Sequence, residues 1–98
     1  MFDDQLKSFM KIKANNTNLK KLEQLFGALG YKIIYEKGQF NAGYCIVNDK
    51  KIIVINRFFK NDARFHCLSD ILNELALDSS NLDEAQKTFH QGIIDQGK

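Results

Sequence analysis

The chain contains no proline and no tryptophan, and it has only two cysteines. Without proline, no loop is stiffened by a ring-locked backbone. Cys45 and Cys67 could form one disulfide at most, and neither belongs to a Cys-x-x-Cys pair. Both have apolar neighbours, and free cysteine is among the residues most often buried. We therefore expect two reduced thiols in or near the core.

The chain also lacks a large excess of one charge sign. It contains 14 Lys and Arg and 12 Asp and Glu, which gives a net charge of +2. This balance is too small to indicate a nucleic acid or an anionic membrane as partner. The start, Met1 to Asp4, is acidic where a secretory signal would be basic. The longest apolar run, Ile52 to Ile55, is far too short to span a bilayer. We expect a cytoplasmic protein without membrane contact.

What is present is the composition of one folded domain. Hydrophobic residues make up 44% and charged residues 27% of the 98 residues, which is typical of a globular protein. A second hydrophobic core would not fit in a chain of this length. The sequence therefore predicts a single domain over residues 1–98.

Apolar residues at helical spacing predict three helices. Asn18 to Leu29 has a leucine-rich stripe and ends at Gly30, and 62–77 has a broad apolar arc. Asn81 with Glu84 resembles a capping box for a short helix to about His90, followed by a frayed tail over 92–98. A looser pattern allows a further helix over 3–13, within a loosely attached segment 1–17.

Between these helices the apolar period changes to two, which is typical of strands. The predicted strands are 31–37, 44–48 and 51–56, and Asn48 to Lys50 joins the last two in a tight hairpin. The fold class is therefore α+β. We expect a helix, a three-stranded antiparallel sheet arranged as a β-meander, and then two helices, with the helices on one sheet face.

The predicted strand 51–56 does not fit a plain meander. Its residues Ile52 to Ile55 are apolar on both faces, as in a strand that is covered on both sides. As the last strand of a meander, however, it would lie at an edge of the sheet. Either the N-terminal segment or a second copy of the chain could cover it. A homodimer and a monomer are therefore equally expected. The interface of the homodimer would consist of Ile52, Ile53, Val54 and Ile55.

The helix predicted over 62–77 carries the most pointed set of polar residues. His66 and Asp70 are four residues apart, a spacing that suits an ion pair or two metal ligands. Catalytic zinc takes about three protein ligands, and the only other histidine is His90. We therefore assign no metal, cofactor or catalytic residue. A binding face on this helix remains a hypothesis, formed by Arg64, His66, Ser69, Asp70 and Asn73.

The stretch from Gly43 to Glu74, about a third of the chain, resembles the core of small bacterial metallopeptidases of the ImmA/IrrE type. In these enzymes a hairpin precedes a helix that reads Arg-Phe-x-x-x-His-Glu-x-x-His, and Arg64 and Phe65 match its opening. Ser69 and Asn73 stand at the two zinc histidines, and Asp70 stands at the catalytic glutamate. The resemblance implies a related fold whose activity is lost. The whole chain also resembles short bacterial proteins, a likeness that implies no particular function.

A second candidate is the basic and aromatic run from Arg57 to Lys60, which contains Phe58 and Phe59. Aromatic rings beside cations can stack on unpaired bases. Between a strand and a helix, however, phenylalanine more often closes the end of the core. We expect both rings to be packed inside, so a nucleic-acid partner is not expected, and a weak nucleic-acid binder is only the third hypothesis.

No pair of residues in the sequence has the spacing of an activated nucleophile. His66 and Cys67 are neighbours, so on a helix they point about 100° apart. The leading hypothesis is a non-enzymatic interaction domain that binds another protein or itself. The alternative is a catalytically inactive metallopeptidase-like protein that keeps a peptide-binding cleft.

Overall fold

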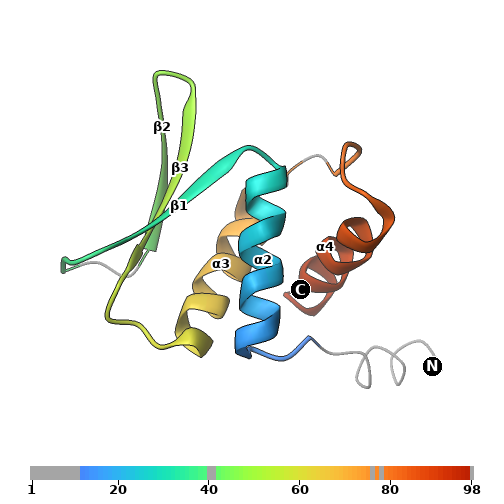
Figure 1. The fold of residues 1–98 in the computed structure, drawn as a ribbon, viewed down its shortest axis with the longest axis horizontal. Helices are drawn as coiled ribbons and strands as arrows, with labels where there is room; N and C mark the ends of the chain where they lie inside the picture. The colour runs from blue at the N-terminus through green and yellow to red at the C-terminus, as the bar shows by residue number, and fades with distance from the viewer. Residues whose placement is uncertain (1–11, 40–41, 76, 78, 98) are drawn as a thin grey trace.

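The computed structural model describes residues 12–97 except 40, 41, 76 and 78. The helix predicted over 3–13 falls mainly on residues outside this part. Two helices follow a three-stranded sheet, and another helix precedes it (Figure 1). The prediction of an α+β fold is confirmed. The elements are α2 (Asn16–Ala28), β1 (Tyr31–Glu36), β2 (Ala42–Val47), β3 (Lys50–Asn56), α3 (Asn61–Leu75) and α4 (Glu84–Gln96).

The sheet is mixed, so the predicted β-meander is wrong in its strand order. The order is β1-β3-β2, with β1 parallel to β3 and β2 antiparallel to it. The hairpin between β2 and β3 is present, and its two turn residues, Asn48 and Asp49, have φ of 50° and 65°. Positive φ at both central positions matches the twist of the flanking strands. The chain thus inserts its last strand between the other two.

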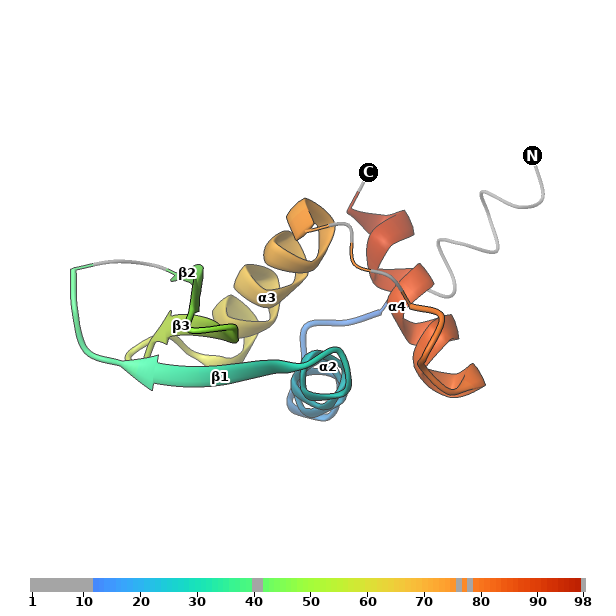
Figure 2. The ribbon, with the colours of Figure 1, turned by 90° about the horizontal axis from the view of Figure 1, so that it is seen from above.

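The central position of β3 explains why this strand is apolar on both faces. Ile53 and Ile55 are fully buried, facing α2 and α3, which lie on one side of the sheet (Figure 2). Ile52 and Val54 point to the opposite face and are half-buried. Of the four residues predicted as an interface, Ile53 and Ile55 therefore belong to the core, and β3 is not the edge strand that the prediction took it to be.

Both helices with a defined N-cap begin at residues other than those predicted. Asn15, not Asn18, caps α2, because its side chain accepts from the amide of Asn18 at 2.8 Å. In α4 the capping box joins Asp83 and Gln86 instead of Asn81 and Glu84. Alternative Asx residues lie close together at both sites, and any of them can accept these bonds.

The last helix is longer than the sequence indicated. It continues to Gln96, through most of the segment that was predicted to fray. Ile93 is fully buried there, and this packing stabilises a turn that local propensity would leave open. Asn73 of α3 lies so close to Gly97 that a Cβ at that position would meet its amide group. The end of α4 is therefore anchored on α3.

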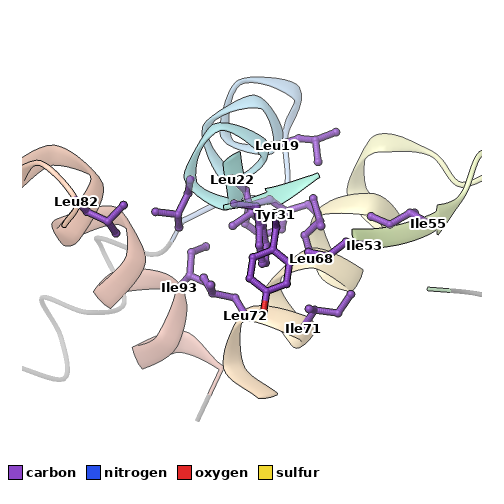
Figure 3. Close-up of a cluster of buried hydrophobic side chains, with 13 residues drawn as sticks. Leu19, Leu22, Tyr31, Ile53, Ile55, Leu68, Ile71, Leu72, Leu82 and Ile93 are labelled. Carbon is purple, nitrogen blue, oxygen red and sulfur yellow. The ribbon is translucent and has the colours of Figure 1, made fainter. Parts of the chain in front are cut away.

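The core lies between the sheet and the helices α2 and α3, and it continues between these two helices and α4, where Leu82 and Ile93 are buried (Figure 3). Phe26 and Phe65, its largest fully buried side chains, come from α2 and α3. Phe26 meets Tyr31 of β1 edge to face, with ring centroids 5.9 Å apart. No helix among the described residues is long and apolar enough to cross a membrane.

Candidate functional site

The residues predicted as a binding face of α3 do not come together. His66 and Asp70 are exposed, whereas Ser69 is buried, with 9% of its surface accessible. Asn73 donates from Nδ2 to the carbonyl oxygen of Ser69 at 2.9 Å, so its amide serves the helix backbone. Arg64 turns towards the sheet. The packing of α4 against one flank of α3 separates these side chains, which a helical projection placed on a single side.

Two of the positions that correspond to the metallopeptidase motif are therefore enclosed by the fold, since Ser69 is buried and Asn73 lies beside the end of α4. The Ser69 hydroxyl is buried and has no hydrogen-bond partner among the described residues. Gly97 at the end of α4 approaches Asn73 closely. These two residues do not line an open cleft.

A metal centre is not assembled by the part of the chain that the structure describes. No group of three or more His, Cys, Asp and Glu side chains there is placed to share an ion. His66 and Asp70 project into solvent from α3, while His90 is buried in α4. The three residues that could have formed a zinc site thus lie in different environments.

The buried side chain of His90 makes the stability of the fold depend on pH. Burial lowers the pKa of its imidazole, and its Nε2 has no hydrogen-bond partner among the described residues. A depressed pKa means that the unfolded chain takes up a proton more readily. The contribution of His90 to stability is therefore full above its ordinary pKa and is lost as the pH falls through the lowered value.

We expect the free energy of unfolding to fall between about pH 7 and pH 5, partly through His90. The variant His90→Met lacks this part of the loss, so its free energy of unfolding should change less between the two pH values. Urea unfolding followed by circular dichroism measures the free energy of unfolding at each pH. An unchanged difference in the variant would show that His90 does not carry this dependence.

The two thiols are free and differ in environment. Cys45 is exposed on β2, whereas Cys67 is half-buried on α3. Burial, followed by the nearby carboxylate of Asp70, raises the pKa of the Cys67 thiol. A raised pKa leaves less of the reactive thiolate, and the side chain of Cys67 packs against the core.

A polar cluster that the sequence did not reveal joins α2, β1 and α3. The hydroxyl of Tyr35 donates to a carboxylate oxygen of Glu23. The guanidinium of Arg64 lies over the Tyr35 ring, with Cζ 4.3 Å from its centroid. Arg64 also donates from Nη2 to the carbonyl of Arg57 at 2.8 Å, while its buried Nε has no partner among the described residues. The cluster ties three elements together at one end of the sheet.

The strand β2 forms an exposed sheet edge with two large hydrophobic side chains. Tyr44 is 41% and Ile46 is 63% exposed. The Tyr44 hydroxyl lies 3.4 Å from Oε1 of Glu74 on α3. No charged residue occurs between Ala42 and Val47. Among the described strands β2 pairs only with β3, so this edge combines backbone groups that no second strand pairs with and apolar side chains.

The two phenylalanines after β3 have different environments, so the prediction that both are packed inside is wrong for one of them. Phe59 packs against the core, whereas Phe58 is 72% exposed. These two consecutive residues of one tight turn therefore differ in burial.

An open groove of about 830 Å³ lies between α2 and α4. Leu25 and Phe89 supply apolar surface, while Lys21, Asp83 and Glu84 supply charge. Asp83 is already engaged in capping α4, and Glu84 pairs with Lys87 at 4.0 Å. The lining does not present a set of groups aimed at one ligand atom.

No protein-family model matches the chain, and no curated protein or solved structure matches it either.

Proposed function

We propose that the chain is a small protein-interaction domain that binds an extended segment of a partner chain along the free edge of β2. The supporting observation is the uncharged edge strand with Tyr44 and Ile46 exposed. The partner is another protein or a second copy of this chain.

An edge strand presents a row of free N–H and C=O groups that can pair with another strand. Proteins usually block such pairing with charged residues or proline. The other edge, β1, follows this rule with Lys32 and Glu36, but β2 has neither kind of residue. The difference between the two edges favours β2 as the docking strand.

The side chains around β2 could add selectivity to this backbone pairing. Tyr44 and Ile46 alternate along the strand on the face that carries the helices, since they pair with Ile53 and Lys51. Glu74 of α3 lies next to the Tyr44 hydroxyl. A partner strand would therefore meet an apolar pair of side chains bordered by a carboxylate.

Light scattering on a size-exclusion column, over a wide range of protein concentration, tests for the second copy. Self-association through β2 predicts a mass that rises towards the dimer, and Ile46→Lys should keep the chain monomeric because it places a charge on the edge. The matched control is Phe58→Lys, which changes a similarly exposed hydrophobic residue away from β2 and should associate like wild type.

A monomeric wild type would direct the test to another protein. The same two variants are then compared with wild type for the proteins that copurify with each of them. Loss of a copurifying protein in Ile46→Lys but not in Phe58→Lys supports the proposal. Equal behaviour of the two variants in both experiments contradicts it.

A further inference from the structure

Phe58 is the most exposed large hydrophobic side chain among the described residues, and it stands on a firmly bonded turn. The side chain of Asn56 accepts from the amide of Phe58 at 3.0 Å. The carbonyl of Asn56 accepts from the amide of Phe59 at 3.1 Å. Two consecutive amides are thus fixed by one residue, so the backbone sets the direction in which the Phe58 side chain leaves the turn.

Further bonds attach this turn to its surroundings. The amide of Arg57 donates to the carbonyl of Glu36 at 3.0 Å, and Arg64 donates to the carbonyl of Arg57. Phe59, the next residue, is packed against the core. The backbone that carries the exposed ring is therefore ordered before any partner arrives, which lowers the entropic cost of binding.

Cations flank the exposed ring in the sequence. Arg57 precedes it, Lys60 follows two residues later, and both are exposed. Lys37 directly follows Glu36, the residue that bonds to Arg57. Asp62 is the carboxylate nearest to Phe58 in sequence, and Glu36 is brought to the turn by its carbonyl bond to Arg57. The three cations Arg57, Lys60 and Lys37 outnumber these two carboxylates, so the turn carries a small local excess of positive charge.

We propose that this turn, residues 56–60, binds single-stranded nucleic acid. An unpaired base stacks on the Phe58 ring, while the phosphates on either side of that base pair with Arg57 and Lys60. Stacking accepts any base because every base has a flat π face, so the site has little sequence preference. This surface is separate from the β2 edge and goes beyond the protein-interaction role.

The observations favour nucleic acid over a membrane surface. Membrane binding by amphipathic elements needs a broad apolar face, whereas this turn exposes one aromatic ring. A base needs only one ring, and cations on both sides suit the phosphates that flank it. The same residues give low affinity for a duplex, whose bases are already stacked.

Fluorescence anisotropy with labelled oligo-dT and oligo-U, at low salt, tests the proposal. Wild type should bind both single strands more tightly than a duplex of equal length. Phe58→Ala should weaken binding by about 5- to 100-fold, and Phe58→Trp should retain it. Because the side chain is exposed, Phe58→Ala keeps the fold, as a circular dichroism spectrum will verify. The control Ile46→Ala should bind oligonucleotides like wild type.

The salt dependence provides a second measurement. Changing Arg57 or Lys60 to Gln should reduce the slope of log affinity against log salt by about 0.7 for each phosphate that the protein no longer neutralises. Absence of oligonucleotide binding by wild type, or equal binding by wild type and Phe58→Ala, would overturn the proposal. So would binding to phosphatidylglycerol vesicles that depends on Phe58 when oligonucleotide binding does not. Phe58 variants should leave association through β2 unchanged, so the two proposals can fail separately.

Discussion

Ile53→Ala is expected to lower the free energy of unfolding by about 2–5 kcal/mol. Ile53 lies in the central strand, faces the helices and has 0% of its surface exposed. Removing its outer carbons leaves a cavity that the surrounding strands and helices cannot fill completely. The same change at Ile52, its half-buried neighbour on the other face, should cost about 1 kcal/mol.

The two isoleucines form a matched pair, because the residue type, the strand and the replacement are the same. Urea unfolding followed by circular dichroism gives both free energies, and dilute protein keeps any association out of the comparison. A loss at Ile52 as large as that at Ile53 would contradict the assignment of the core to one face of the sheet. If Ile52→Ala and Ile53→Ala lower the free energy of unfolding equally only in concentrated protein, a second copy of the chain covers the sheet face opposite the helices.

Tyr35→Phe is expected to lower the free energy of unfolding by about 1.5–3 kcal/mol, the usual effect of losing a hydrogen bond to a charged group. The change removes the hydroxyl that donates to Glu23 and leaves the ring beneath Arg64 in place. Glu23→Ala tests the other partner, because it removes the carboxylate that accepts the bond. In a double-mutant cycle the combined change should cost less than the sum of the single changes, because both remove the same bond. Additive losses would show that the bond does not contribute.

The same hydrogen bond should make the fold sensitive to alkali. Burial, and then the Glu23 carboxylate, raise the pKa of the Tyr35 phenol well above its ordinary value. Its contribution to stability is therefore full below about pH 10 and is lost as the pH rises through the raised pKa. Tyr35→Phe should lose less stability than wild type between about pH 9 and pH 11. Equal losses would contradict this assignment.

Periodicity in the sequence was sufficient to predict the helices, the strands and the hairpin, because each depends on residues close together in the chain. The pairing of β1 was not predicted, since a meander and a mixed sheet require the same local pattern. A signal was present: Ile52 to Ile55 are apolar on both faces, as a central strand needs, whereas Lys32 and Glu36 in β1 suit an edge.

The candidate surfaces were harder to predict because they depend on contacts between distant elements. A helical projection grouped Ser69 with His66, but the packing of α4 against α3 leaves one buried and the other exposed. Tyr35 and Glu23 are 12 residues apart and belong to no common periodic pattern. The contrast between Phe58 and Phe59 is set by the geometry of one turn, which composition does not encode.

The strand order has a consequence for the growing chain during synthesis. β1 and β2 do not pair with each other, and each depends on β3, the last of the three strands to leave the ribosome. No hydrogen bonds between the strands of this sheet can form until residues 50–56 have left the ribosome. A nascent chain that stalls after Asn48 therefore carries two strands without their shared partner, and the sheet is completed as the ribosome reaches α3 and the remaining helix.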